Sequence, residues 1–409
     1  MPLRRILLVV LMAWPFAGHA DEVDHGKVAD RIEQLVEKNF YDPKRAEAFD
    51  AAPLRAGGLA PAEFDKAAAD ALAGLGVSHT GRYTSDRIDY FELLDIFRFA
   101  VRNDLRRIFP PRGTVGYAGI GMRVAEIDGR RFVTDVYHGG SAARAGVREG
   151  DEMLAVDGEP YREIASFEKK VGKTVTLTLR REESAEPIEV SVKVEAIRPN
   201  ELFTASISES IRTIESGRFK IGYMRIWSFT SAETRQLISD ELGAGRLAGA
   251  DALVLDLRSR WGGAPLDAAE VFVGRTPPTQ LTKRDGTVAS GNTRWRKPVV
   301  AIIDEGTRSG LEVFAYALKI NDIPLVGTTT AGAVLAGTAY MLPDDSLLIL
   351  AVQDVVTDGK RIEGEGVAPT REVERDIRFE NGNDLQLAAA VEMVRERLEI
   401  ASNVDNAAE

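Results

Sequence analysis

The sequence predicts an α/β domain in its C-terminal half, preceded by a β-rich domain and a helical N-terminal region. From about residue 200, short β-branched apolar runs alternate with amphipathic stretches, as strands and helices do in α/β layer folds. Between residues 113 and 199, short strand patterns are separated by turn pairs such as Asp157-Gly158. Residues 21–112 carry apolar positions at helical spacing instead. A chain of 409 residues is long enough for separate cores.

The N-terminus has the pattern of an export signal. Arg4 and Arg5 precede the apolar stretch Ile6–Ala17, and Gly18-His19-Ala20 places small residues at the two positions critical for cleavage. We therefore expect residues 1–20 to be a signal peptide. The chain has no cysteine and so no disulfides, which fits a periplasmic location better than an extracellular one. An uncleaved membrane anchor is the alternative, although the apolar stretch is short for a stable span.

Charge and composition narrow the classes of partner. The net charge is −11, and it becomes −13 without residues 1–20, which contain two arginines and no acid. An acidic chain without a basic tract argues against nucleic acid or anionic lipid as the main partner. No other segment is apolar over a membrane-spanning length, so we expect no stable membrane span after signal removal. The sequence leaves the oligomeric state open.

Cofactor and metal sites are not expected. The four histidines are scattered and there is no thiolate, so no metal-ligand pattern occurs. Gly172-Lys173-Thr174 is present, but Phe167 occupies the position of the first glycine of the P-loop pattern, so a phosphate-binding P-loop is not expected.

In the helical N-terminal region, three stretches have the periodicity of amphipathic helices. They are Val28–Phe40, Pro61–Leu75 and Asp89–Phe109. The run Pro110-Pro111-Arg112-Gly113 breaks this pattern, so we place the boundary with the β-rich domain at residue 112.

In the β-rich domain, the strand pattern recurs in five short segments. The expected strands are Ile120–Glu126, Phe132–Tyr137, Glu152–Val156, Thr174–Arg180 and Ile188–Val194. A short helix is expected at Ser141–Gly146, and another helix near Ile164–Lys170.

In the α/β domain, residues 200–400, strands and helices alternate. The expected strands are Lys220–Ile226, Ala252–Leu257, Val299–Ile303, Pro324–Val326 and Ser346–Val352. The expected helices are Ser231–Ala244, Pro265–Phe272, Leu311–Lys319 and Asp384–Ile400. Residues 401–409 are polar and are expected to form a flexible tail. Such folds bind ligands at the carboxyl ends of their strands.

Ser309 lies at the tight turn between the strand Val299–Ile303 and the helix Leu311–Lys319. A turn of this kind exposes a hydroxyl and directs backbone N–H groups towards whatever binds there. A serine nucleophile needs both features, because it must be accessible and have oxyanion donors nearby. The alternative is that Ser309 only caps the helix.

One segment of the β-rich domain resembles a bacterial PDZ domain. Its sequence is Gly139-Gly140-Ser141-Ala142-Ala143-Arg144-Ala145-Gly146-Val147-Arg148-Glu149-Gly150-Asp151, followed by Leu154-Ala155-Val156-Asp157-Gly158. In that family this segment is the helix that flanks the peptide groove and the next strand. The resemblance implies that the loop Gly119-Ile120-Gly121-Met122 binds a peptide C-terminal carboxylate through converging backbone N–H groups. The peptide would add as a strand beside Ile120–Val124. Otherwise, these glycines form only a turn.

The α/β domain resembles the tail-specific (C-terminal processing) peptidase family, because five motifs occur in the family's order. They are Gly222-Tyr223-Met224-Arg225-Ile226; Leu255-Asp256-Leu257-Arg258 with Gly262-Gly263; Asp304-Glu305-Gly306-Thr307-Arg308-Ser309; Val326-Gly327-Thr328-Thr329; and Gly364-Glu365-Gly366-Val367-Ala368-Pro369. The resemblance implies a serine peptidase with a crotonase-like α/β core, a mixed sheet with helices. It also implies that Ser309 is the nucleophile and that backbone N–H groups near Gly263 and of Gly310 stabilise the oxyanion.

The general base differs from that of the best-known branch of this family. That branch uses a lysine, and the matching position here is Ala333. The pair Ser78-His79 instead resembles the tricorn-like branch, in which a histidine is the base and a glutamate near the C-terminus completes a tetrad. The matching glutamate is Glu363, although Glu365 could take its place. Histidine can accept the serine proton near neutral pH, and Ser78 and the glutamate would orient it. A hydrogen-bonded loop histidine is the alternative for His79.

The function that we expect is that of an exported serine endopeptidase which captures apolar C-terminal tails of proteins or peptides in the PDZ groove. The alternative is a catalytically inactive PDZ adaptor that binds C-termini without cutting them. Whether the PDZ domain gates the active site stays open at this point. Arg308 could bind a substrate carboxylate or could simply be solvated, and the sequence favours neither.

Overall fold

The structure of the protein is a computed structural model that describes residues 24–258, 261–274, 280–282, 284, 288–290 and 295–408. The expected signal peptide lies outside these residues. The helices are α1 (His25–Asn39), α2 (Pro43–Ala46), the 3₁₀ helix η1 (Ala52–Arg55), α3 (Pro61–Ala73), α4 (Ile88–Ile96), α5 (Arg102–Ile108), α6 (Ser141–Arg144), α7 (Pro199–Ser210), α8 (Ala232–Gly243), α9 (Glu270–Val273), α10 (Gly310–Ile320) and α11 (Leu385–Ala408). None of the described helices is both long enough and apolar enough to cross a membrane.

The strands form two larger sheets and three small ones among the described residues. They are β1 (Gly81–Tyr83), β2 (Tyr117–Gly119), β3 (Met122–Ile127), β4 (Arg130–Val136), β5 (Glu152–Val156), β6 (Thr174–Arg180), β7 (Ile188–Lys193), β8 (Glu195–Ile197), β9 (Arg212–Ser216), β10 (Phe219–Arg225), β11 (Ala252–Asp256), β12 (Gln280–Thr282), β13 (Val288–Ser290), β14 (Val299–Ile303), β15 (Leu325–Gly327), β16 (Ala336–Met341), β17 (Leu347–Gln353) and β18 (Arg371–Glu372).

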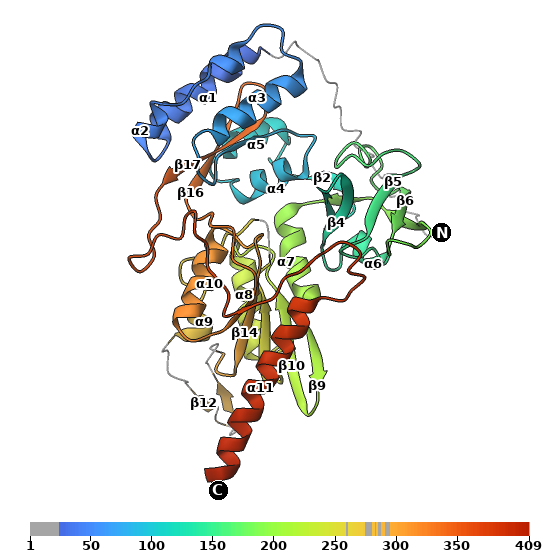
Figure 1. The fold of residues 1–409 in the computed structure, drawn as a ribbon, viewed down its shortest axis with the longest axis vertical. Coiled ribbons are helices and arrows are strands. Elements are labelled where there is room, and N and C mark those ends of the chain that lie inside the picture. Colours follow the sequence, from blue (N-terminus) through green and yellow to red (C-terminus); the bar gives the residue numbers. More distant parts are fainter. Residues whose placement is uncertain are drawn as a thin grey trace, which may run out of the picture.

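A six-stranded sheet with the order β18-β15-β14-β11-β10-β9 forms the centre of the α/β domain. Its strands are parallel except β9, which pairs antiparallel with β10, so the sheet is mixed as the sequence predicts. Every residue of β11 and β14 is buried, as expected for parallel strands that are covered on both faces. Helix α11 covers one face, and α8, α9 and α10 lie on the other (Figure 1).

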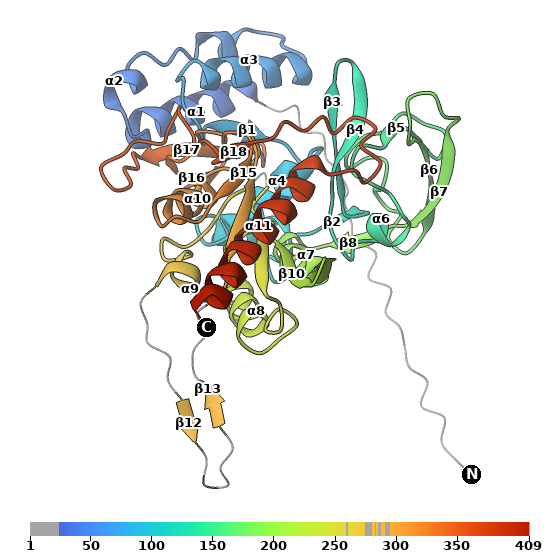
Figure 2. The ribbon, with the colours of Figure 1, turned by 60° about the horizontal axis from the view of Figure 1, so that its bottom comes forward.

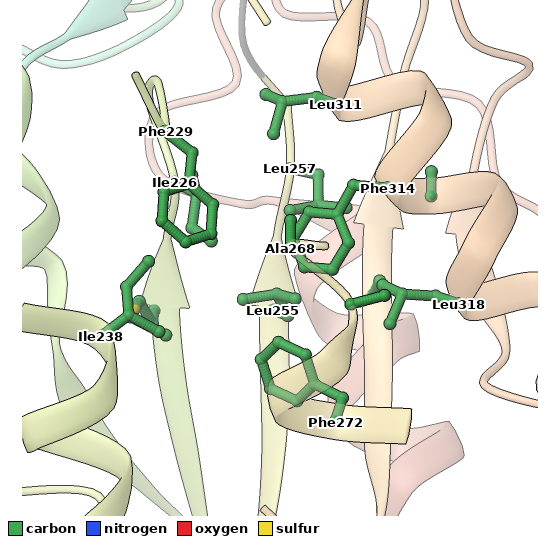
Figure 3. Packing of buried hydrophobic residues seen from close by; sticks show 14 of the residues in the cluster. Ile226, Phe229, Ile238, Leu255, Leu257, Ala268, Phe272, Leu311, Phe314 and Leu318 are labelled. Atoms are coloured by element: carbon green, nitrogen blue, oxygen red, sulfur yellow. The ribbon is translucent and has the colours of Figure 1, made fainter. Parts of the chain in front are cut away.

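The main core lies between the sheet and α10. Phe314 and Leu318 of α10 point towards Leu255 of β11, and Phe272 of α9 closes the same cluster (Figure 3). This packing fixes the start of α10, and therefore Ser309, against the carboxyl end of β14.

The N-terminal helices share their core with a hairpin from the C-terminal half. Strand β1 pairs antiparallel with β17, with Gly81 opposite Ile349, and β17 pairs with β16. Ile32 and Leu72 are buried against Leu348 of this hairpin. The N-terminal region is therefore bound tightly to the α/β domain, and residues far apart in sequence meet there.

The β-rich domain is a five-stranded sheet with the order β3-β4-β5-β6-β7, next to the pair β2-β8. Within the described residues, β3 pairs only with β4 and is therefore an edge strand. The segment between β18 and α11 loops over this domain (Figure 2). There Phe379 N donates to Gly150 O over 3.0 Å, and the Phe379 ring packs edge-on against Phe132.

Three expected helices differ in the structure. The stretch Asp89–Phe109 is broken into α4 and α5, because Asn200 Nδ2 and Arg98 donate to the carbonyl of Asp95 and cap α4 there. Within Pro265–Phe272 only the end is helical, in α9, and Ile164–Lys170 forms a series of turns.

The C-terminal helix is longer than expected. α11 continues to Ala408, so residues predicted to form a flexible tail are helical up to that residue. Polarity indicated a loose tail, but a polar stretch can extend a helix into solvent when nothing in its sequence terminates it.

Prediction for the core. Replacing Phe314, which is 2% exposed, by alanine should lower the free energy of unfolding by about 3–5 kcal/mol, because a large apolar side chain is lost from a packed site. Ile320 on the same helix is 51% exposed, and its replacement by alanine should change stability by about 0.5 kcal/mol or less. Urea unfolding followed by tryptophan fluorescence measures both, since Trp227 and Trp295 lie in this cluster. Equal losses in the two variants would contradict the packing described.

Candidate active site

Ser309 has an unusual backbone conformation. Its φ is 56° and its ψ is −132°, in a region that residues other than glycine rarely adopt and that recurs at functional sites. Two hydrogen bonds hold the turn, because Ser309 N donates to Ala333 O over 2.8 Å and to Glu312 Oε2 over 3.1 Å. The turn therefore places a half-buried serine side chain at the carboxyl end of the parallel sheet.

The glycine pair expected to supply oxyanion donors packs directly on this turn. A Cβ atom on Gly262 would lie 2.2 Å from Arg308 O and 2.6 Å from Ser309 Cβ. A Cβ atom on Gly310 would lie 2.4 Å from Ala264 N. The backbones of residues 262–264 and 308–310 thus touch with no room for side chains. This contact places residues 262–264 directly beside the turn that carries Ser309.

Ser78, His79 and Glu363 lie together, although they come from opposite ends of the chain. Ser78 Oγ donates to Glu363 Oε2 over 2.9 Å, and Ser78 N donates to Glu363 Oε1 over 2.9 Å. Ser78 Oγ also lies 2.9 Å from His79 Nδ1. Glu365, the alternative carboxylate, is exposed. The geometry therefore pairs Glu363 with Ser78.

These contacts define the tautomer of His79. A carboxylate only accepts hydrogen bonds, so the Ser78 hydroxyl proton points towards Glu363. Ser78 Oγ must then accept from His79, which puts the imidazole proton on Nδ1. His79 Nε2 is left with its lone pair free, which is the form a general base requires.

The segment 332–335 separates the serine turn from this relay, and two carboxylates hold it. Glu312 accepts from the N–H groups of Gly332 and Ala333 over 2.7 Å each. Glu363 accepts from Val334 N over 2.8 Å and Leu335 N over 3.2 Å. Four consecutive N–H groups are thus shared between the two glutamates.

Ser309 and His79 both lie against one stretch of backbone, residues 333–337. The carbonyl of Ala333 receives the Ser309 N–H, and a Cβ on nearby Gly337 would lie 3.2 Å from His79 Cβ. Ala333, the position of the lysine in the other branch, is therefore next to Ser309, but it carries only a methyl group.

Charge and burial set the protonation of the relay. Burial, reinforced by the positive charge of Arg308, lowers the pKa of His79 to about 4, and Glu363 partly opposes this. Burial acts to raise the pKa of Glu363, but hydrogen bonds from Ser78, Val334 and Leu335 outweigh it, so this pKa lies below its ordinary value. At neutral pH the histidine is therefore neutral and the glutamate charged.

The loop Gly119-Ile120-Gly121-Met122 adjoins α6. Ile120 O accepts from Ala142 N over 2.8 Å and from Ser141 Oγ over 3.1 Å. Gly121 has φ 74°, a conformation that suits glycine and turns the loop into the edge strand β3. The Ile120 carbonyl is occupied by α6, so the edge for an added strand begins at Met122.

A buried ionic cluster joins this domain to the glycine pair. Glu92 of α4 is fully buried and pairs with Arg123 of β3 over 2.6 Å. It also accepts from Tyr137 Oη over 2.7 Å and from the indole N–H of Trp261, the residue before Gly262. Through Glu92, the cluster links Arg123 and Tyr137 of the β-rich domain to Trp261, the neighbour of the glycine pair.

Sequence reasoning missed Glu312 and Glu92. Glu312 follows Ser309 by three residues, which is the spacing of a capping box, and this spacing could have identified it as the partner of the Ser309 N–H. Glu92 had no such local signal, because its partners lie 31, 45 and 169 residues away.

Comparison with known proteins identifies two domains. Residues 220–373 match the profile of peptidase family S41, and residues 132–181 match that of the PDZ domain. Carboxy-terminal processing protease CtpA of Bacillus subtilis (strain 168) is 28% identical over 272 residues, covering 63% of this chain and 56% of that protein. The carboxyl-terminal-processing protease of Picosynechococcus sp. (PCC 7002) is 27% identical over 306 residues, covering 69% of this chain and 72% of that protein.

Among solved structures, the tricorn protease aligns with a TM-score of 0.53 at 16% identity, over 92% of this chain and 37% of the tricorn chain. This likeness concerns the fold alone. The fold class that the sequence predicts, with a mixed α/β domain, a β-rich PDZ domain and N-terminal helices, is confirmed. The region of this chain that aligns with the B. subtilis protein spans 56% of that protein's length.

Prediction for the relay. Replacing Glu363 by glutamine should lower the pKa of His79 below its value of about 4, because the carboxylate raises that pKa and the amide has no charge. NMR titration of the imidazole resonances measures the shift, and the spectrum of His79→Gln assigns the signal. Glu365→Gln is the matched control, since Glu365 is exposed. A His79 pKa that rises in Glu363→Gln, or that Glu365→Gln lowers equally, would contradict the relay.

Proposed function

We propose that this member of the S41 C-terminal processing peptidase family, which carries a PDZ domain, hydrolyses peptide bonds of protein substrates through Ser309 with His79 as the general base. The observation that carries the proposal is the relay from Glu363 through Ser78 to His79 Nδ1. The relay supplies a histidine of defined tautomer where the lysine of the other branch is absent.

In the proposed reaction, Ser309 Oγ attacks the carbonyl carbon of the substrate while His79 Nε2 takes its proton. The N–H groups of Gly310 and near Gly263 stabilise the negative oxygen of the tetrahedral intermediate. The protonated His79 then gives its proton to the leaving amine, and the acyl-enzyme remains. A water molecule, deprotonated by His79, then attacks the ester carbonyl carbon. The bond to Ser309 Oγ breaks as His79 returns this proton to Oγ, which releases the acid product and restores free Ser309 and neutral His79.

The relay supports the charged state of His79 during this reaction. Because the pKa of His79 is about 4, the imidazole is neutral at pH 7 and is a weak base in the resting site. When the imidazole gains a proton, the Nδ1–H bond to Ser78, and the charge of Glu363 behind it, stabilise the cation.

We further propose that the PDZ domain binds the apolar C-terminal tail of the substrate. The backbone of the loop Gly119–Met122 would bind the terminal carboxylate, and the tail would pair with the open edge of β3. The matched relatives are named for C-terminal processing, which is consistent with tail capture.

The location that we propose is the periplasm. The support is the basic and apolar pattern of residues 1–20 with its small residues at the cleavage site, together with the absence of cysteine.

Prediction for the nucleophile. A fluorophosphonate should label the wild-type protein once, and labelling should be lost in Ser309→Ala and reduced by at least about 100-fold in His79→Ala, because an unassisted serine is a weak nucleophile. Intact-mass spectrometry of the purified protein measures this, with the exposed surface variant Arg112→Gln as the control. A wild-type protein that stays unlabelled, even with an apolar C-terminal peptide present, would favour the inactive PDZ adaptor instead.

Prediction for pH dependence. The base must be neutral, so the labelling rate should stay high as the pH falls to about 5 and should decline only near pH 4, where His79 takes up a proton. An ordinary histidine would lose activity around pH 6.5. The rate constant of labelling measured between pH 3.5 and pH 8 distinguishes the two, with circular dichroism at each pH to verify folding. Half-loss near pH 6.5 would count against the burial of His79.

A further inference from the structure

Arg308 immediately precedes Ser309, and no described residue pairs with its guanidinium group. Its side chain is half-buried, and it forms no hydrogen bond or ion pair with any residue that the structure describes. Its backbone is held firmly, because Leu311 N donates to Arg308 O over 3.2 Å and Gly262 packs against the same carbonyl. The turn therefore presents an unpaired cation from a fixed position beside the candidate nucleophile.

The acidic residues around the turn all have other partners. Asp304 accepts from the N–H groups of Gly306 and Thr307, and Glu305 accepts from Thr328 Oγ1. Glu312 and Glu363 hold the segment 332–335. None of these carboxylates neutralises Arg308.

An unpaired arginine at such a place is unusual for this protein. The buried arginines in the described parts of the chain, Arg123, Arg225 and Arg258, are paired with carboxylates. The half-buried Arg82 and Arg375, whose side chains are 7% and 12% exposed, are paired with carboxylates as well. A half-buried guanidinium ordinarily pairs, because its five donors match a carboxylate and remain costly to leave unsatisfied. The missing partner of Arg308 is therefore expected to come from outside the chain.

The charge of Arg308 acts on the space in front of the base. It lowers the pKa of His79, and it also opposes the rise that burial causes in the pKa of Tyr83 on β1. The charge of Arg308 is therefore felt at both His79 and Tyr83.

We propose that Arg308 binds a carboxylate of the substrate next to the bond that Ser309 attacks, so that the protein prefers peptides with a negative charge at this position. The inference rests on the proposed function and names a substrate class for it. The carboxylate could be the α-carboxylate of a short tail or the side chain of Asp or Glu, and both have the geometry that a guanidinium binds through two parallel hydrogen bonds.

Binding would also change the base. Among the described residues, Arg308 and Glu363 are the charged groups that shift the pKa of His79, and Arg308 also affects the pKa of Tyr83. A bound carboxylate would cancel the field of Arg308 and leave that of Glu363. The pKa of His79 would then rise towards its ordinary value, making His79 a stronger base when the correct substrate is present.

The test measures binding separately from turnover. Calorimetry with Ser309→Ala protein would compare peptides of one sequence with a free or amidated C-terminus, and with Glu or Gln at each of three positions on either side of the bond. We expect a carboxylate at one position to tighten binding by about 10- to 100-fold, the effect of a charge-assisted pair. Adding Arg308→Gln should abolish this difference, and adding Arg308→Lys should retain part of it.

The control variant replaces an exposed arginine elsewhere in the chain. Arg112→Gln, which removes an exposed arginine from the loop between α5 and β2, should keep the full difference. A gain confined to the free C-terminus identifies the α-carboxylate, and a gain confined to Glu identifies an acidic side chain. Equal binding of charged and neutral peptides, or a preference that survives in Arg308→Gln, would overturn the proposal. Failure of fluorophosphonate labelling in the wild type would instead reject the proposed function.

Discussion

The candidate site depends on the hydrogen bonds that two glutamates accept from one short segment of backbone. Glu312 and Glu363 accept the four successive N–H groups of residues 332–335, and each also binds one side of the site, Ser309 N in one case and Ser78 in the other. A carboxylate has room for several donors, so it can fix a loop that has no regular structure. The two glutamates therefore fix the segment that lies between Ser309 and the Ser78-His79 pair.

The same principle joins the PDZ domain to the site. Glu92 is fully buried and would be costly to leave unpaired, so Arg123 of the edge strand, Tyr137 and Trp261 must all stay in contact with it. A displacement of β3 would leave this carboxylate without its cation, and Trp261 adjoins the glycine pair. The PDZ domain is thus held in place by a polar contact that is sensitive to small movements.

The sequence predicted what depends on local pattern. The strand before Ser309, the glycine pair and the Ser78-His79 motif could be found because each has a short signature, and in the structure Ser78 donates a hydrogen bond to Glu363. Contacts that depend on the third dimension could not be found. Glu92 has no local signature, the capping of Asp95 by Asn200 breaks a helix whose periodicity continues, and α11 persists through a polar stretch that was expected to be loose.

The relay also has a consequence for biosynthesis. Ser78 and Glu363 are 285 residues apart, and β1, which follows His79, finds its partner only when β17 has been made. A ribosome releases the N-terminal end first, so the emerging chain carries a histidine without its glutamate during most of translation. The relay between Ser78, His79 and Glu363 can therefore form only after Glu363 and β17 have been synthesised.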